Sequence, residues 1–387
     1  MKKIGIVTTT RAEYYLLRPL IRDLRKDDLF ETIVYVTGTH LAKQYGETVN
    51  QIEKDKIKID YKVPIDFRGC TPKDISGVMV QIQNSFSEIF SQRSLDLLII
   101  LGDRFELMPI VIAASLFGIS LAHIHGGEVT EGAYDEYIRH SITKFSHLHF
   151  TSCEDHKRRV IQLGESPERV FNVGSLGIQN VKHIVPANKR EIEEFLNLNI
   201  NDNFVLVTLH SETKENQEYQ KQMVQSLLNA LDQVDIKIIF TQGNADQYGE
   251  LIDSEICNFV KNNSKKAFYF NTLGEKYYFS LIPYLKGVIG NSSSGIIEVP
   301  SFNIPVLNIG NRQKGRICSK AIVHCDSSES QILCGIRKIL SDGYRKKVVV
   351  YKNPYDGDDV SGKILQTIKS FDKFPTAKSF YDLKVSE

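Results

Sequence analysis

Side chains that can transfer protons gather in one short stretch of the chain. His123, His125 and Glu128 surround a pair of glycines, and Asp135 and Arg139 follow shortly after. Carboxylates and imidazoles concentrated in one loop are suited to general acid–base catalysis. A His-x-His pair beside a glutamate could instead bind zinc. We expect acid–base catalysis without a metal, and the zinc site is the alternative.

The neighbouring sequence indicates how these side chains would be presented. His123 and His125 lie two positions apart, so they are expected on one face of a strand. The two glycines that follow allow a tight turn, which would direct Glu128 toward a ligand. Asp103 and Arg104 follow another apolar run, where α/β enzymes hold their active sites. An aspartate that caps a helix beside a surface arginine would show the same pattern.

A second group of residues is suited to binding a phosphate or diphosphate. A serine-rich turn follows the apolar run 285–289 and leads into a short helical segment. Backbone N–H groups at such a turn attract anions, and a carboxylate one turn later can accept hydrogen bonds from a ribose. Cations in the loop 310–316 would add charge-assisted contacts. Simpler interpretations are a serine cap and a solvated basic loop. The candidates are Ser292, Ser293, Ser294, Glu298 and Arg312.

Three further strand ends hold candidate binding residues. Arg11 lies in the turn after the first strand, behind three threonines, where it could contact a diphosphate or a sugar. This turn lacks the G-x-G-x-x-G pattern of nicotinamide-binding domains, so we expect no cofactor. His210 and Asn244 follow two strands in the second half of the chain. A hydrogen-bonded structural histidine and an ordinary turn are the alternatives there.

The elements that must position these residues alternate between strands and helices along the whole chain. The strands are β-branched and almost continuously apolar, which predicts parallel sheets covered on both faces. A break near residue 185 divides the chain into two Rossmann-like domains, 1–185 and 186–387, with a final helix that could cross back to the first. Such domains hold a ligand in a central cleft at the strand ends. The predicted strands are 3–8, 32–36, 59–63, 97–101, 120–125, 148–151, 170–173, 204–209, 236–240, 267–270, 287–289 and 305–309.

Composition excludes several classes of partner. The net charge is +1, so there is no electrostatic reason to expect binding to nucleic acid or to an anionic membrane. No apolar run approaches the roughly 20 residues of a membrane span, and the N-terminus lacks the pattern of a signal peptide. The six cysteines are scattered, which is typical of reduced thiols. We therefore expect a cytoplasmic protein.

Taken together, six motifs resemble one enzyme family, the hydrolysing UDP-N-acetylglucosamine 2-epimerases of sialic acid synthesis. The resemblance runs from the first strand to about residue 320, and its motifs occur in the order expected for that family. It implies a GT-B fold in which the C-terminal domain holds most of the UDP. The motifs are residues 10–14 (TRAEY), 101–104 (LGDR), 123–128 (HIHGGE), 138–140 (IRH), 291–295 (NSSSG) and 310–316 (GNRQKGR).

The resemblance also implies roles for individual residues. Ser292, Ser293 and Arg312 would contact the diphosphate and Glu298 the ribose, while Arg11 and Arg104 would approach the nucleotide phosphates. The acid–base carboxylates would be Asp103, Glu128 and Asp135, assisted by His210. Asp135 is matched by its distance to Arg139, because the segment after Glu128 is one residue longer than in the animal enzyme. The remaining expected substrate-binding residues are His123, His125, Arg139, Asn244 and Ser294.

The expected reaction begins with a UDP-2-acetamido sugar of gluco configuration. Loss of the C2 proton and of UDP would give a glycal-like intermediate, and addition of water with reprotonation at C2 would give the free manno sugar. The substrate would be UDP-N-acetylglucosamine, or a UDP-2,4-diacetamido-trideoxy sugar of the legionaminic acid route. A GT-B glycosyltransferase and a catalytically inactive nucleotide-sugar-binding protein are the other classes. We expect a homodimer or a homotetramer.

Overall fold

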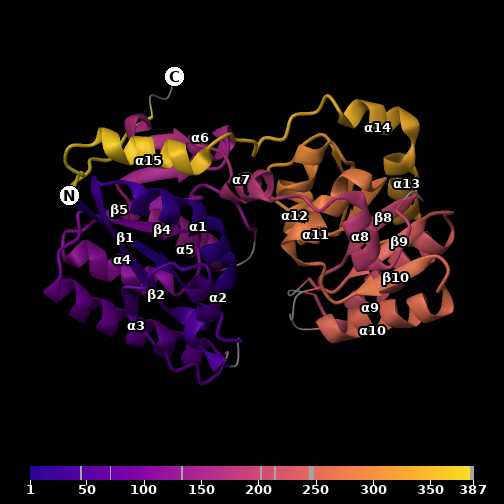
Figure 1. Cartoon of the computed structure of the whole chain (residues 1–387), viewed down its shortest axis with the longest axis horizontal. Helices are drawn as coiled ribbons and strands as arrows, with labels where there is room; N and C mark the ends of the chain where they lie inside the picture. The colour runs from indigo at the N-terminus through magenta and orange to yellow at the C-terminus, as the bar shows by residue number, and fades with distance from the viewer. Residues whose placement is uncertain are drawn as a thin grey trace. The chain divides into compact units, whose positions relative to one another are not determined.

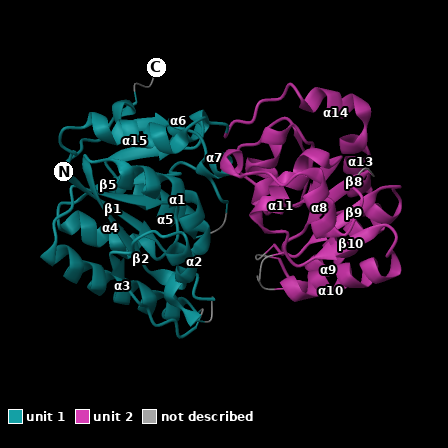
Figure 2. Cartoon of the chain, viewed as in Figure 1, with its two compact units in different colours: residues 1–180, 356–387 teal, residues 181–355 magenta. Residues whose placement is uncertain are grey.

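The chain forms two compact α/β units. The computed structural model describes residues 1–43, 46–69, 71–131, 134–200, 203–212, 215–243 and 248–383 (Figure 1). Unit 1 consists of residues 1–180 and 356–387, and unit 2 of residues 181–355 (Figure 2). The last helix, α15 (Val360–Ser370), is therefore part of unit 1 although it follows unit 2 in the sequence.

Unit 1 is built on a seven-stranded parallel sheet with the order β3-β2-β1-β4-β5-β6-β7. Every residue of β4 is buried, as expected for a strand covered on both faces. The strands are β1 (Lys2–Thr8), β2 (Phe30–Val36), β3 (Tyr61–Lys62), β4 (Leu97–Leu101), β5 (Ser120–Ile124), β6 (Leu148–Thr151) and β7 (Val170–Asn172).

Helices cover both faces of this sheet. Alternate residues of β1 point to opposite sides, so Ile6 packs with α1 and α15, and Val7 packs with α3 and α4. The helices of this part of the chain are α1 (Arg11–Lys26), α2 (Val49–Lys54), α3 (Pro72–Gln92), α4 (Leu107–Leu116), α5 (Asp135–Phe145), α6 (Glu154–Gln162) and α7 (Leu176–His183), which continues into unit 2.

Unit 2 is built on a six-stranded parallel sheet with the order β10-β9-β8-β11-β12-β13. Gly290 ends β11 with φ +135°, and a Cβ there would lie 1.8 Å from the carbonyl oxygen of Thr208, so only glycine fits. The strands are β8 (Phe204–Thr208), β9 (Lys237–Thr241), β10 (Ala267–Phe270), β11 (Gly287–Gly290), β12 (Val306–Ile309) and β13 (Ile322–Cys325). The helices are α8 (Lys189–Leu196), α9 (Gln217–Asp232), α10 (Gly249–Asn262), α11 (Gly274–Leu281), α12 (Ser293–Ile297), α13 (Glu329–Leu340) and α14 (Asp342–Val348).

The prediction of two parallel sheets is confirmed. Each predicted strand range overlaps an observed strand, and the sequence missed only β13 among the strands described. In β13 only Ile322 is buried, because this short strand forms the edge of the sheet, so its sequence lacks the continuous apolar run that identified the others.

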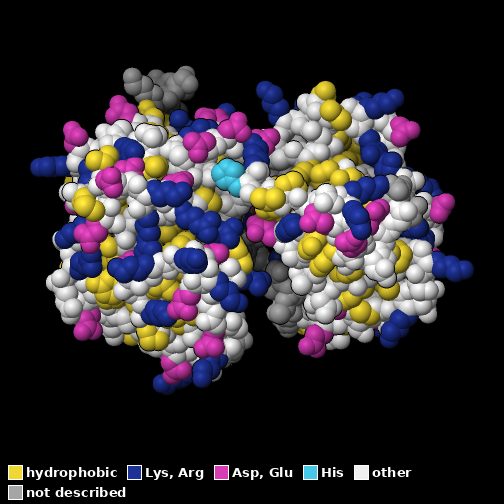
Figure 3. All heavy atoms as spheres, in the orientation of Figure 1, with side chains coloured by type: hydrophobic (Ala, Val, Ile, Leu, Met, Phe, Trp, Pro, Cys, Tyr) yellow, Lys and Arg dark blue, Asp and Glu magenta, His cyan; other side chains and the backbone are white. Residues whose placement is uncertain are grey.

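The surface and the helices agree with the near-neutral composition. On the face shown in Figure 3, Lys and Arg side chains are interspersed with Asp and Glu, in keeping with the net charge of +1. Within the described ranges, no helix has both the length and the apolar character needed to cross a membrane.

Candidate active site

Two of the candidate acid–base residues, Asp103 and Glu128, are held by one buried arginine. Arg139 of α5 is 2% exposed and donates through Nε to Oδ2 of Asp103 at 2.8 Å. Its Nη1 donates to the carbonyl oxygen of Glu128 at 2.9 Å and to the Glu136 carboxylate at 2.5 Å. Its Nη2 donates to Asp103 and to Oγ1 of Thr130, the latter at 2.7 Å. Arg139 thus connects the loops that follow β4 and β5.

This arrangement changes the role expected for Arg139. A guanidinium has five N–H bonds, and the five hydrogen bonds to protein groups use them all. The structure therefore favours a role in orienting Asp103 and the Glu128 loop over the predicted contact with substrate. Glu136 was not predicted as part of the site. Its helical spacing of three from Arg139 and four from His140 was the available signal.

Asp135 is the first residue of α5 and is partly buried. Burial and the negative charge of Asp103 both raise its pKa. A carboxyl group with a raised pKa retains its proton more readily and is suited to donating it. The pKa of Glu136, by contrast, is lowered. Burial acts to raise it, but the hydrogen bonds from the Thr130 amide and from His140 outweigh burial. The pKa values of two adjacent carboxyl groups in one helix are therefore shifted in opposite directions.

The two histidines of the His-x-His pair are in different environments. His123 is fully buried in β5, with Nε2 on the carbonyl oxygen of Gly102 at 2.8 Å and Nδ1 on Oγ1 of Thr143 at 3.1 Å. Burial lowers the pKa of His123 to about 3. Both ring nitrogens contact the protein, so the structure does not support a contact between His123 and substrate.

His125 lies beyond the end of the strand. Its backbone has φ +65°, so the expectation that His123 and His125 share a strand face is wrong. The reason is that the chain leaves the sheet one residue before the glycine pair. His125 Nδ1 lies 3.9 Å from Oε1 of Glu128. Among the residues described, no group of three or more His, Cys, Asp or Glu side chains is arranged to hold a metal ion.

The two arginines expected near the phosphates lie at neighbouring strand ends. Arg104 follows β4 and donates two hydrogen bonds to the Glu106 carboxylate, from Nε to Oε2 at 3.1 Å and from Nη2 to Oε1 at 2.9 Å. Glu106 is fully buried, whereas the Arg104 side chain is 42% exposed and can still face an anion. Arg11 is exposed in the first turn of α1, which begins with a capping box formed by Thr10 and Glu13. Glu106 was not predicted.

In unit 2, the buried residue Asn291 holds three strand ends together. Its side chain donates through Nδ2 to the carbonyl oxygen of His210 at 2.8 Å and accepts from the His210 amide at 2.7 Å. Its own carbonyl oxygen accepts from Arg312 at 3.2 Å and from Gln313 at 2.8 Å. The loops after β8, β11 and β12 are thereby fixed to one another. Asn291 belongs to a motif noted in the sequence, but its side chain was not expected to organise the site.

The predicted phosphate-binding residues lie on these loops. Ser292 is the N-cap of α12 and makes no side-chain cap bond, Ser293 is exposed, and Ser294 is partly buried. Glu298 ends the same short helix and is partly buried. Burial and the charge of Arg312 lower the pKa of His210 to about 4, so its imidazole is neutral near pH 7.

A buried carboxylate supports the basic loop. Glu212 accepts from the Asn311 amide at 2.8 Å, and a Cβ on Gly310 would meet its Oε1 at 2.1 Å. Burial raises the pKa of Glu212. This carboxylate holds the backbone from which Arg312 projects. Asn244, the remaining predicted binding residue, lies outside the described residues.

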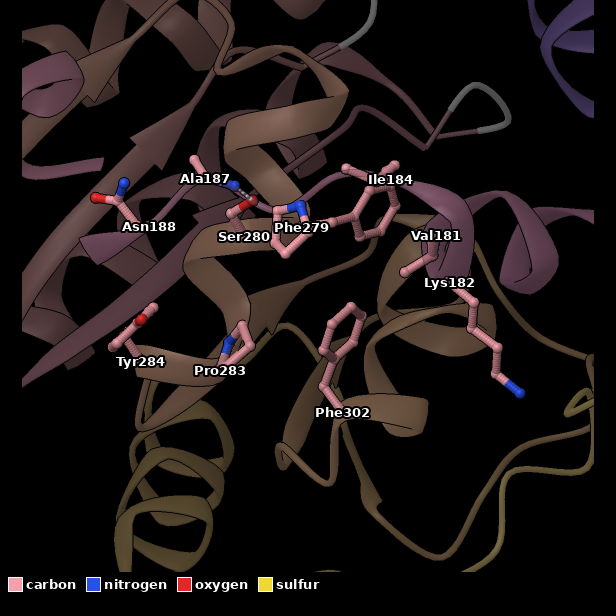
Figure 4. A pocket seen from close by; sticks show the side chains of 11 residues that line it. Val181, Lys182, Ile184, Ala187, Asn188, Phe279, Ser280, Pro283, Tyr284 and Phe302 are labelled. Atoms are coloured by element: carbon pink, nitrogen blue, oxygen red, sulfur yellow. Dashed lines mark hydrogen bonds between the residues drawn. The ribbon is translucent and has the colours of Figure 1, made fainter. Parts of the chain in front are cut away.

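Unit 2 also contains an apolar pocket of about 520 Å³ (Figure 4). The rings of Phe279 and Phe302 are stacked in it, with centroids 6.2 Å apart, and Ser280 Oγ accepts from the Ala187 amide at 2.8 Å. None of the predicted site residues lines this pocket, so it is separate from the candidate residues on the strand ends. Its lining is Val181, Lys182, Ile184, Pro186, Ala187, Asn188, Phe279, Ser280, Pro283, Tyr284 and Phe302.

Comparisons with known proteins show which family and which proteins the chain resembles. The family model described as UDP-N-acetylglucosamine 2-epimerase matches residues 22–369. The chain is 39% identical over 385 residues to the Campylobacter jejuni protein named GDP/UDP-N,N'-diacetylbacillosamine 2-epimerase (hydrolyzing), covering 99% of both chains. It is 39% identical over 387 residues to the Escherichia coli polysialic acid biosynthesis protein P7, covering 99% of this chain and 98% of that one.

The fold is also similar to that of a solved structure described as a UDP-GlcNAc 2-epimerase. The Neisseria meningitidis UDP-GlcNAc 2-epimerase, crystallised with UDP-GlcNAc, matches with a TM-score of 0.79 and 19% identity, over 96% of this chain and all of the other. The α/β architecture is GT-B-like, as predicted.

Proposed function

The chain belongs to the UDP-N-acetylglucosamine 2-epimerase family, and from this premise we propose that it converts UDP-N-acetylglucosamine to UDP and free N-acetylmannosamine. The coarser activity, hydrolytic 2-epimerisation of a nucleotide sugar, follows from relatives at 31–39% identity over nearly the whole chain. The finer choice of substrate is a proposal. A UDP-2,4-diacetamido-trideoxy sugar is the second candidate, because two of these relatives are named for diacetylbacillosamine.

The observation that supports the chemistry is the carboxylate cluster of unit 1. Elimination of UDP requires one group that takes the C2 proton, and reprotonation requires one that supplies a proton to C2. Asp103 lies against the Arg139 guanidinium, whereas burial and the charge of Asp103 raise the pKa of Asp135. Carboxyl groups in such different environments are suited to opposite roles. Glu128, on the loop held by Arg139, is the third candidate.

Unit 2 is proposed to hold the UDP. Ser292, Ser293 and Arg312 would contact the diphosphate, and Glu298 would accept hydrogen bonds from the ribose. Negative charge develops on the diphosphate as the C1–O bond breaks, and a guanidinium fixed beside it would stabilise the departing UDP. The fixed position of Arg312, bonded to Asn291 at 3.2 Å, supports this assignment. Arg11 and Arg104 are the corresponding cations of unit 1.

The test is turnover in heavy water. The proposed reaction exchanges the C2 proton with solvent, so the free manno sugar should contain deuterium at C2 and UDP should form in equal amount. Each candidate UDP sugar is incubated separately, and the products are analysed by NMR and mass spectrometry. The sugar that is turned over with the higher kcat/KM identifies the substrate.

Other outcomes are equally informative. A free gluco sugar without deuterium would show simple hydrolysis and would refute the epimerase mechanism. A labelled product that remains attached to UDP would show epimerisation without hydrolysis. Transfer of the sugar to an added acceptor, without C2 labelling, would identify a glycosyltransferase.

A further inference from the structure

The loop that presents Glu128 is held by a helix that the mechanism above does not use. Gly127 has φ +81°, and a Cβ there would lie 2.4 Å from the carbonyl oxygen of His156 in α6. The guanidinium of Arg159, also in α6, donates to the carbonyl oxygen of Gly127. The backbone of this loop is therefore pressed against the first turns of α6, which brings the side chains of that helix close to Glu128.

A chain of hydrogen bonds connects α6 with the Glu128 carboxylate. Ser152 directly follows β6, the neighbour of β5 in the sheet, and its Oγ donates to Oε1 of Glu128 at 3.3 Å. The same Oγ lies 2.9 Å from Nδ1 of His156. Ser152 and His156 are each 1% exposed. A serine hydroxyl and an imidazole are thus buried in series behind a candidate catalytic carboxylate.

The donor count makes this chain directional. An ionised carboxylate only accepts, and a serine hydroxyl has a single proton to donate. While Ser152 donates to ionised Glu128, Nδ1 of His156 must therefore donate to Ser152. Once Glu128 holds a proton, the direction can reverse, with Glu128 donating to Ser152 and Ser152 donating to Nδ1. The protonation of Glu128 and that of His156 are consequently linked through one hydroxyl.

We propose that Ser152 and His156 form a buried proton relay that protonates and deprotonates Glu128 during turnover. In the deprotonation step the O–H bond of Glu128 breaks as its proton passes to Ser152 Oγ, and the original O–H bond of Ser152 breaks as its proton passes to Nδ1. Glu128 becomes a carboxylate, Ser152 remains a neutral hydroxyl, and His156 becomes an imidazolium. The reverse step protonates Glu128. This inference rests on the proposed function, in which Glu128 is one of three candidate acid–base carboxylates, and it assigns to Glu128 a change of protonation in each cycle.

Substitutions that separate proton transfer from positioning test the relay. Ser152→Ala removes the bridging hydroxyl, and Ser152→Thr keeps it. His156→Asn keeps a donor at the position of Nδ1 but cannot be protonated, so it preserves the hydrogen bond to Ser152 without the relay. We expect Ser152→Ala and His156→Asn to lower kcat by at least about tenfold, a part of the 10²–10⁴ that a positioned acid–base group supplies. The inhibition constant for UDP should change by less than about twofold, since the printed hydrogen bonds of Ser152 and His156 lead to Glu128 and neither residue is a proposed UDP contact.

A conservative variant and a double variant distinguish loss of the relay from general damage to the site. Ser152→Thr should retain most of the wild-type kcat. In a Glu128→Gln background, Ser152→Ala should cause no further loss, because the relay acts through Glu128. Surface changes at comparable residue types, Ser91→Ala and His183→Asn, serve as controls, and thermal unfolding establishes that each variant is folded.

Two results would overturn the relay. Wild-type kcat in His156→Asn would show that the pair only positions the carboxylate. A further loss from Ser152→Ala in the Glu128→Gln background would show that Ser152 does not act through Glu128, a comparison that remains valid even if the single variant is less stable. Both results leave the proposed function intact as long as the wild-type enzyme releases UDP and a C2-labelled manno sugar. Failure of that wild-type assay would overturn the function and the relay together.

Discussion

Arg139 on helix α5 holds Asp103, which follows strand β4, by donating from Nε to Oδ2 at 2.8 Å. The two residues are 36 positions apart in the sequence, and Arg139 is almost completely buried. A charged pair in this setting fixes the orientation of the carboxylate, because the guanidinium is itself bonded to Glu128, Thr130 and Glu136. The candidate site of unit 1 is therefore a network with its arginine at the centre.

Arg139→Lys tests this arrangement. A lysine keeps the positive charge but cannot form the paired contacts of a guanidinium, so Asp103 should lose its orientation. We expect kcat to fall by about 10² while UDP affinity changes little. The variant should also lose on the order of 2–4 kcal/mol in free energy of unfolding, since the partly buried carboxylates of Asp103 and Glu136 lose hydrogen bonds from a buried cation. Steady-state kinetics and denaturant unfolding measure the two effects. Arg158→Lys, at an exposed ion pair, is the control, and equal loss of kcat there would argue against a specific role.

Glu128→Gln tests the carboxylate presented after the glycine pair. The amide has nearly the same shape but cannot accept and return a proton, so turnover should fall by at least about 10² with the fold and UDP binding preserved. Release of UDP and isothermal calorimetry provide the measurements. Glu168→Gln, a substitution on the surface of the same unit, should leave turnover and UDP binding unchanged. Wild-type turnover in Glu128→Gln would remove this residue from the mechanism.

Arg312→Ala tests the proposed diphosphate contact in unit 2. Loss of one charge-assisted hydrogen bond should weaken UDP binding by roughly 1.5–3 kcal/mol, or about 10- to 150-fold. Calorimetric titration with UDP at constant salt measures the change. The matched control is Arg337→Ala, because Arg337 is exposed on α13 of the same unit. Unchanged affinity in Arg312→Ala would show that this arginine does not bind the nucleotide.

Glu165 links stability to pH. It is 2% exposed and accepts from Lys144 at 2.5 Å, from Lys378 at 2.7 Å and from His149 at 3.1 Å. Burial alone would raise the pKa of this carboxyl, but the three donors outweigh burial and lower the pKa from 4.5 to about 2. A lowered pKa in the folded state stabilises the protein above the ordinary pKa, and this contribution is lost as the pH falls toward 2.

Glu165→Gln should therefore lower the free energy of unfolding by about 3 kcal/mol at pH 7. The difference from wild type should shrink as the pH falls below about 4.5. Urea unfolding at several pH values between 7 and 3 measures this dependence. A difference that stayed constant over this range would mean that the ionised carboxylate is not the source of the stability.

Much of the fold and the position of the site could be predicted from the sequence. Apolar runs such as 97–101 became buried parallel strands, because a strand covered on both faces must be apolar at every position. A buried strand ends where the apolar run ends. The polar residues that follow these runs, including Asp103, Ser292 and Arg312, therefore lie just beyond the strand ends. The six motifs, through their residues and their order, also indicated the family to which the chain belongs.

Contacts between distant residues were decided only by the tertiary structure. Arg139 was expected to bind substrate, yet its five donors face protein groups brought together by β4, β5 and α5. The Asn291 side chain bonds to the backbone of His210, which is 81 positions away. Local sequence patterns record which residues are buried, because burial repeats with the period of a helix or strand. They do not record which polar groups meet, since that depends on how neighbouring strands align and which helices pack beside them.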